Sequence, residues 1–246
     1  MMDLMRDVTK RMIKMTICCL CSLCLLAACD DAEEGLVKVT HYVTFALNGA
    51  DENNNTAVPV GSEYVEPGCV AMEGDKDVTA SVLISGDVDT SQPGVCYVNY
   101  SAQNADGFAS SVTRTVSVYD PSATARDISG TYTVAEGSYR LNIANNTKLP
   151  YSGQTVNVVY YAPGLYFISD YLGGYYDQRA GYGSSYAMTG FFMLNNDNSI
   201  DAFNADVAGW GDSANEVKAS YDEATGCVLL EVTYADVLVF YITLTK

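Results

Sequence analysis

Short runs of alternating apolar and polar residues recur along this chain from residue 37 to its end. The run at 37–47 places Val37, Val39, Val43 and other apolar residues on one face, and the final run, 237–244, alternates in the same way. A period of two is typical of half-buried β-strands. Because we find no convincing amphipathic helical pattern between these runs, the sequence predicts an all-β protein.

The first group of runs lies in residues 36–120. Turn sequences such as Glu66-Pro67-Gly68 and Gln92-Pro93-Gly94 separate the runs. Many short strands at this spacing favour a β-sandwich. Besides 37–47, the candidate strands lie near 58–60, 69–72, 78–85, 95–102 and 112–119.

A second group occupies residues 127–246, after a short break at 121–126 that we interpret as a linker. About eight antiparallel strands in such a length imply a small barrel or sandwich. The sequence leaves open which of the two forms. The candidate strands lie near 128–134, 139–143, 155–161, 164–169, 186–194, 199–203, 216–221, 227–234 and 237–244.

The beginning of the chain has the pattern of a secretory signal peptide, residues 1–28. Lys10, Arg11 and Lys14 precede the uncharged, mostly apolar segment 15–28, which is short for a membrane-spanning helix. Leu26-Ala27-Ala28-Cys29 resembles the bacterial lipobox. That resemblance implies cleavage before Cys29, acylation of Cys29 and attachment to a membrane by the N-terminal lipid.

Residues 29–35 form an acidic tether. The run resembles the export signal of Bacteroidota surface lipoproteins, which implies an outer-membrane, surface-exposed location. The chain after the leader, residues 29–246, carries 9 Lys and Arg against 28 Asp and Glu, a net charge near −19. Since phosphate contacts need basic residues, we expect no nucleic-acid partner.

The first domain resembles the immunoglobulin-like domains of bacterial surface proteins, which implies a β-sandwich that acts as a spacer or binding module. The motifs include Glu66-Pro67-Gly68, Asp106-Gly107 and the segment 114–120. Cys69 and Cys96 stand where that family often has aromatic residues, on strands that we expect to be neighbours. We therefore predict a Cys69–Cys96 disulfide, with two buried free thiols as the alternative, and a buried free thiol at Cys227.

The second domain weakly resembles lipocalin-like barrels through Gly130-Thr131-Tyr132 and its closing strand. The whole layout resembles two-domain Bacteroidota lipoproteins of unknown function. Within the second domain, segment 164–183 is rich in tyrosine and glycine. Exposed aromatic rings with a polar group suit ligand binding. We predict a carbohydrate site formed by Tyr171, Tyr175, Tyr176, Asp177, Arg179, Tyr182 and Trp210, with Asp170 as a further hydrogen-bonding partner. The alternative is that these tyrosines are buried in the barrel or cover its sheet faces.

Catalysis finds little support in the sequence. His41 is the one histidine, and no nucleophile motif accompanies it, so we expect a half-buried strand residue rather than a catalytic base. The count of histidines excludes a His-rich zinc site, the acidic loops lack calcium-loop spacing, and no glycine-rich phosphate loop opens a helix. We predict no cofactor, metal or enzymatic activity, although a carboxylate pair for glycoside hydrolysis stays open.

These observations favour a non-catalytic surface lipoprotein that binds extracellular glycan, and the family resemblance implies outer-membrane polysaccharide uptake proteins as its partners. The glycan step rests on family resemblance and on the aromatic segment. Two alternatives remain: an adhesion or assembly protein that binds a protein partner, and a barrel that holds a small apolar ligand.

Overall fold

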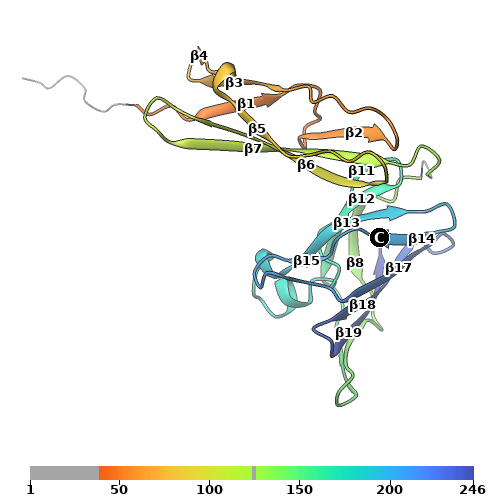
Figure 1. Ribbon diagram of the computed structural model, residues 1–246. Helices are drawn as coiled ribbons and strands as arrows, with labels where there is room; N and C mark the ends of the chain where they lie inside the picture. The colour runs from red at the N-terminus through yellow and green to blue at the C-terminus, as the bar shows by residue number, and fades with distance from the viewer. Residues whose placement is uncertain (1–38, 124–125) are drawn as a thin grey trace, which may run out of the picture. The chain divides into compact units, whose positions relative to one another are not determined.

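The computed structural model describes residues 39–123 and 126–246, and it is built of β-strands with three short helical turns (Figure 1). The all-β prediction is therefore confirmed. The leader, Cys29 and the tether at 29–35 lie outside the described residues, as do Thr124 and Ala125 of the predicted linker. In the described part, no helix has the length and apolar character needed to cross a membrane.

The first domain consists of two sheets. The smaller sheet has the order β1-β3-β4, and the larger has the order β2-β7-β6-β5, in which β2 and β7 run parallel. The strands are β1 (Val43–Leu47), β2 (Asn55–Pro59), β3 (Cys69–Glu73), β4 (Lys76–Asp77), β5 (Leu83–Ser85), β6 (Gly94–Gln103) and β7 (Ala109–Tyr119), with a 3₁₀ turn η1 (Thr79–Ser81) before β5.

Alternating residues from both sheets meet in one core. Val43 of β1 and Ala71 of β3 are buried with Val98 and Tyr100 of β6 and Val116 of β7. This alternation of buried and exposed residues along each strand is what the period-two pattern predicts for a sandwich.

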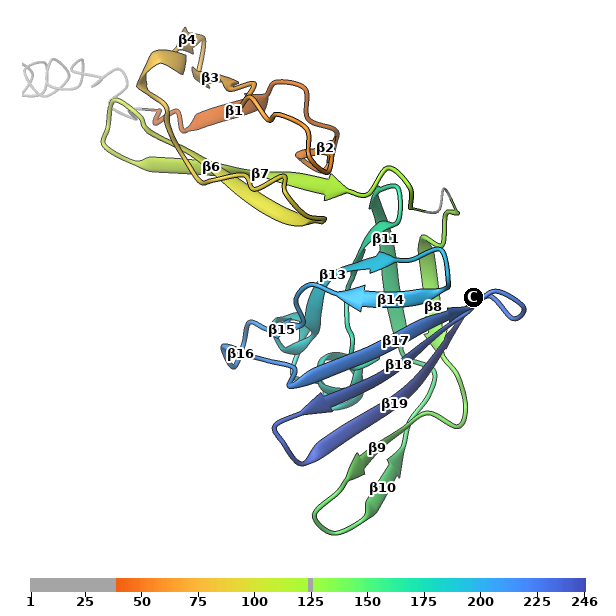
Figure 2. The ribbon, with the colours of Figure 1, turned by 45° about the vertical axis from the view of Figure 1, so that its right-hand side comes forward.

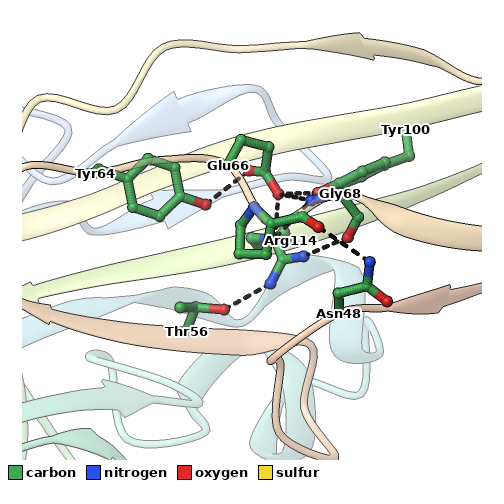
Figure 3. Close-up of polar contacts among 8 residues, drawn as sticks. Asn48, Thr56, Tyr64, Glu66, Gly68, Tyr100 and Arg114 are labelled. Carbon is green, nitrogen blue, oxygen red and sulfur yellow. Dashed lines mark hydrogen bonds and ion pairs between the residues drawn. The ribbon is translucent and has the colours of Figure 1, made fainter.

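A buried arginine lies within this domain (Figure 3). The side chain of Arg114 is fully buried, and its Nε lies 3.0 Å from Glu66 Oε1. Its Nη1 donates to Thr56 at 2.7 Å and its Nη2 to the carbonyl of Gly68 at 3.0 Å. The hydroxyls of Tyr64 and Tyr100 donate to the same Glu66 carboxylate. A buried charge is tolerated only when it is paired and hydrogen-bonded, and this one is both.

The predicted Cys69–Cys96 disulfide is absent, because both residues are free thiols. Cys69 lies on β3, opposite Leu47 of β1, while Cys96 lies on β6 in the other sheet, opposite Val116. The prediction had assumed that these two strands are neighbours, but they belong to different sheets. The half-buried Cys96 thiol instead approaches the carbonyl of Asp89 at 3.9 Å.

His41 also differs from its prediction, because it is exposed and precedes the first strand. β1 begins at Val43, opposite Glu73, the last residue of β3 before the chain turns toward β4. The antiparallel ladder therefore ends at Val43, although the sequence alternation continues toward residue 37.

The second domain is a closed antiparallel barrel of eight strands. Its order is β8-β11-β12-β13-β14-β17-β18-β19, and β19 pairs with β8 to close the ring. The barrel strands are β8 (Gly130–Val134), β11 (Thr155–Ala162), β12 (Leu165–Ile168), β13 (Met188–Leu194), β14 (Ser199–Ala202), β17 (Glu216–Asp222), β18 (Cys227–Tyr234) and β19 (Leu238–Thr245). The choice between barrel and sandwich is thus settled in favour of the barrel.

Two hairpins extend from the ring (Figure 2). β9 (Tyr139–Asn142) and β10 (Thr147–Pro150) continue the sheet from the first half of β19, and β15 (Asp206–Val207) and β16 (Asp212–Ser213) branch from β13. Of these four strands, the sequence pattern predicted β9 alone.

The barrel interior holds one continuous cluster of buried side chains. Tyr132, Tyr166, Phe192 and Phe240 are among its largest members, each at most 1 % exposed. Burial raises the pKa of the Tyr166 phenol to about 12. Buried tyrosines thus help to fill the barrel, as our alternative interpretation of the tyrosine-rich sequence expected. Cys227, the first residue of β18, is a free thiol as predicted, but it is half-buried and not buried.

Candidate functional site

The tyrosine-rich segment after β12 is organised by one buried carboxylate. Asp170 is 2 % exposed, and its Oδ1 accepts hydrogen bonds from the backbone N–H groups of Leu172 at 2.7 Å and Met188 at 3.1 Å. Its Oδ2 accepts a third from Gly174 at 2.9 Å. Asp170 therefore ties the segment back to the start of β13.

Burial raises the pKa of Asp170 to about 7, although the three N–H donors act in the opposite direction. Directly after it, Gly173 and Gly174 both adopt left-handed backbone angles, with φ of 62° and 71°. Such angles are strained for residues with a Cβ. A Cβ on Gly174 would also lie 2.8 Å from side-chain atoms of Gln154 and Gln178, so the sharp turn into the following helix requires glycine.

That turn leads into a single π-helical turn, η2 (Tyr175–Arg179), and then into a 3₁₀ turn, η3 (Ser184–Tyr186). The β15–β16 hairpin lies beside η3, because the N–H of Gly209 donates to the carbonyl of Ser185 at 2.7 Å. A Cβ on Gly209 would meet that carbonyl and the Tyr186 ring at 2.8 Å. Glycine therefore allows the hairpin to bring Trp210 against the tyrosines.

Four aromatic side chains, which we call the ring surface, meet here: Tyr176, Tyr182, Tyr186 and Trp210. The Trp210 ring lies 4.8 Å from Tyr176, 6.1 Å from Tyr182 and 4.9 Å from Tyr186, measured between ring centroids. Tyr182 is 57 % exposed and Trp210 is 42 % exposed, while Tyr176 and Tyr186 are half-buried. The ring surface is thus a solvent-accessible group of aromatic faces.

Buried groups support the ring surface from below. Tyr234, at the end of β18, lies 6.3 Å from Trp210 and donates its hydroxyl to Asp212 at 2.8 Å. Phe240 of β19 lies 6.1 Å from Tyr176. Because these residues belong to barrel strands, the rings rest on a rigid base.

Two arginines flank Tyr175, which lies behind the ring surface. The guanidinium carbons of Arg140, on β9, and of Arg179, on η2, each lie 5.0 Å from the centroid of the Tyr175 ring. Arg140 also hydrogen-bonds to the hydroxyl of Tyr176. Burial raises the pKa of that tyrosine, and the Arg140 charge lowers it. No ion pair joins Arg140 or Arg179 to a carboxylate within the described residues.

The structure separates the predicted site residues into two groups. Tyr171 and Tyr175 are 0 % and 5 % exposed, so they belong to the core and not to a surface platform. Tyr171 instead donates its hydroxyl to the carbonyl of Phe191 at 3.1 Å. Asp170 is likewise structural. The remaining predicted residues lie around the ring surface with at least partial exposure: Tyr176, Asp177, Arg179, Tyr182 and Trp210.

Sequence reasoning missed Arg140, Tyr186 and Tyr234. Each lies in a strand candidate outside the glycine-rich segment, where an aromatic or basic residue is ordinary. Only pairing of β9 with β19, which sets Arg140 opposite Phe240, brings Arg140 to this end of the barrel. No local signal in the sequence indicates that pairing.

A hollow of about 400 Å³ lies on the face of β17, β18 and β19, away from the ring surface, and is lined by residues that include Lys218, Glu231 and Tyr241. Lys218 lies 3.0 Å from Glu216 and 3.5 Å from Glu231. Its charge is thus already compensated, unlike the charges of Arg140 and Arg179. In the described part of the chain, no three His, Cys, Asp or Glu side chains gather as metal ligands would.

Comparison with known proteins identifies the family of this chain. A family model for the immunoglobulin-like domain of bacterial surface proteins matches residues 45–118, and a family model for a C-terminal domain matches residues 120–246. The lipoprotein BT2262 from Bacteroides thetaiotaomicron is 42 % identical, and the match covers 83 % of this chain and all of that one. The chain belongs to the same family as BT2262. The superposition has a TM-score of 0.47, so the assignment rests on the sequence.

This family assignment confirms the predicted two-domain layout with an immunoglobulin-like first domain and relates the chain to a lipoprotein. A weaker similarity is to a structure of the CBM51-2 domain of Clostridium perfringens ZmpB in complex with GlcNAc, at 21 % identity. It covers 51 % of this chain and 28 % of that one, and its TM-score of 0.26 carries no argument. No curated protein matches the sequence.

Proposed function

We propose that this protein is a non-catalytic, lipid-anchored protein of the bacterial outer-membrane surface, and that its second domain binds extracellular glycan on the ring surface. The observation that carries the proposal is the pair of adjacent exposed rings, Tyr182 and Trp210, held on a rigid barrel. Sugar rings offer apolar C–H faces, and exposed aromatics with polar groups suit such ligands. Partnership with polysaccharide uptake proteins would follow from this role.

The placement of the tyrosines favours glycan over a small apolar ligand. A ligand inside the barrel would need open interior space, but buried side chains such as Tyr132, Phe192 and Phe240 form a continuous cluster there. The exposed rings instead lie outside the cluster, where a chain-like ligand has access. Location at the cell surface draws support from the lipoprotein relative and from the surface-protein family of the first domain.

A glycan array tests the proposal directly. The chain from residue 29 onward, with Cys29→Ser to prevent acylation, is compared with the double variant Tyr182→Ala/Trp210→Ala. Substitutions of exposed side chains usually change the unfolding free energy by about 0.5 kcal/mol or less, and the melting temperature of the variant verifies that it is folded. Removing two stacking rings should weaken binding roughly tenfold or more.

Tyr241→Ala serves as the matched control, because Tyr241 lies in the same domain but lines the hollow on β17–β19. We expect this control to bind like the parent. Loss of binding in the control alone would move the glycan site to that hollow. Absence of binding to every glycan on the array would reject the proposal.

One feature of the first domain favours a second candidate, binding to a protein partner. β5 is an edge strand of its sheet, and its Leu83 and Ile84 are 72 % and 49 % exposed. Open strand edges accept further strands from partners. A photo-crosslinker at position 83 on intact cells should form a discrete adduct if this edge is occupied, and no adduct if it is free.

A further inference from the structure

The arginines behind the ring surface indicate what kind of glycan the site takes. Basic residues are rare here, with 9 Lys and Arg against 28 Asp and Glu after residue 28. Two of these nine, Arg140 and Arg179, flank the same ring, that of Tyr175. Neither has an ion pair among the described residues, as is also true of three lysines, but only these two cations gather at one side chain.

The two other arginines of the described chain each form an ion pair with a glutamate. Arg114 lies 3.0 Å from Glu66 and donates to three further groups. Arg126 lies 3.4 Å from Glu223. Against that background, Arg140 and Arg179 keep their charge uncompensated by any carboxylate within 4 Å in the described residues. The Nε of Arg140 is moreover buried without a hydrogen-bond partner.

The nearby carboxylates form no ion pair with these arginines in the described residues. Asp212 accepts the hydroxyl of Tyr234, and Asp170 is buried under three backbone N–H groups. Asp177, on the same helical turn as Arg179, makes no ion pair with it. The Tyr175 ring that both arginines flank lies 5.0 Å from Tyr176, so the two guanidinium groups lie beside the ring surface. Guanidinium groups are the side-chain groups best suited to bind carboxylate or sulfate.

We propose that the ring surface recognises anionic glycan, in which a carboxylate or sulfate group of the sugar pairs with Arg179 and Arg140 while the sugar ring stacks on Trp210 or Tyr182. The inference rests on the proposed glycan binding and adds the charge of the ligand. The negative group of the glycan would form the ion pairs that Arg140 and Arg179 do not form with carboxylates of the protein. The net negative charge of the rest of the surface would repel anionic glycan chains and disfavour their binding outside this site.

A matched pair of ligands tests the charge requirement. Oligomers of a uronic acid are compared by calorimetry with the same oligomers after full methyl esterification, which removes the charge but keeps the sugar rings. A sulfated neutral oligosaccharide and its desulfated form make the second pair and distinguish sulfate from carboxylate. We expect an acidic member to bind at least roughly tenfold more tightly than its uncharged counterpart, because charge-assisted hydrogen bonds are the stronger class.

Arg179→Gln should remove most of this preference, because binding of the acidic oligomers should weaken roughly tenfold while their uncharged counterparts lose less affinity. Arg179 is exposed, so the variant should fold, and Arg179→Lys should restore part of the preference. Arg140→Gln should also reduce the preference for acidic glycan. Because Arg140 is half-buried, the melting temperature of this variant is measured as well. The control is Lys148→Gln, because Lys148 also stacks on a tyrosine, Tyr139, but lies on the opposite face of the β9–β10 hairpin from Arg140.

The outcomes separate the two proposals. Equal binding of charged and uncharged glycans, unaffected by the arginine variants, would overturn the inference and leave glycan binding intact. An equal loss in Lys148→Gln would also overturn it, because the attraction would then be general and not local. If none of these oligosaccharides and no glycan on the array binds, both proposals fail.

Discussion

The two domains use arginine beside tyrosine in opposite ways. In the first domain, Arg114 is fully buried and bound to Glu66, Tyr100, Thr56 and Gly68 (Figure 3). In the second domain, Arg140 and Arg179 flank Tyr175 without a carboxylate partner in the described residues. A guanidinium whose three nitrogens are all hydrogen-bonded inside the domain stabilises the fold. A guanidinium without a carboxylate partner can instead pair with an anionic group of a ligand.

The strongest test of this comparison removes the partner of Arg114. Glu66→Ala leaves the buried guanidinium charge unpaired, and breaking a buried ion pair costs about 3–5 kcal/mol of unfolding free energy. The unfolding free energy of each domain is measured by chemical denaturation, with hydrogen exchange as the probe that distinguishes the two domains. Glu63→Ala is the control, since Glu63 is exposed, three residues away. A change below about 1 kcal/mol in Glu66→Ala would show that Arg114 is not a structural centre.

The next test removes the carboxylate that organises the ring surface. Asp170→Ala leaves three buried N–H groups without an acceptor, and each such loss costs about 1–3 kcal/mol. We expect the second domain to lose at least about 2 kcal/mol in thermal denaturation, together with glycan binding. Asp177→Asn, on the adjacent helical turn, should change stability by less than about 0.5 kcal/mol. Full stability in Asp170→Ala would contradict the role assigned to this residue.

The pH dependence should differ in sign between the domains. Burial alone would raise the pKa of Glu66, but its bonds to Tyr100, Tyr64, Gly68 and Arg114 hold it below the ordinary value of 4.5. The stability that Glu66 gives the first domain is therefore present above pH 4.5 and lost as the pH falls below it.

Asp170 acts in the reverse direction, because burial raises its pKa from 3.8 to about 7. Its contribution is fully present below pH 3.8 and lost as the pH rises through 7. Hydrogen exchange of each domain between pH 3 and 8 should show the first domain weakening in acid. Over the same range, the Asp170 segment should weaken toward neutral pH, and Asp170→Asn should remove that trend. Parallel trends in the two regions would contradict the assignment.

The smallest expected effect concerns the cysteines of the first domain. Because Cys69 and Cys96 lie in different sheets as free thiols, a reductant should leave the melting temperature unchanged within about 1 °C. Burial raises the pKa of the Cys69 thiol, so it should react with alkylating reagents more slowly than Cys96. A reductant-sensitive melting temperature would instead indicate the disulfide that the sequence suggested.

The sequence by itself determined much of the fold. Alternating runs predicted most strands of both domains, because a strand that buries one face must alternate along its own length. Eight of the nine candidate strands after residue 126 are strands of the barrel itself, and the ninth, β9, pairs with its last strand. The tyrosine and glycine content of 164–183 also located the segment from which half of the ring surface comes.

Only the tertiary structure decided which residues of that segment face solvent. Tyr171 and Tyr182 look alike in the sequence, yet one is buried and the other 57 % exposed, because Asp170 and two left-handed glycines fold the chain back between them. Strand pairing likewise placed Cys69 and Cys96 in different sheets and brought Arg140 from β9 to Tyr175. Local alternation specifies that a strand forms, but pairing is a long-range choice, and it decides which side chains share a site.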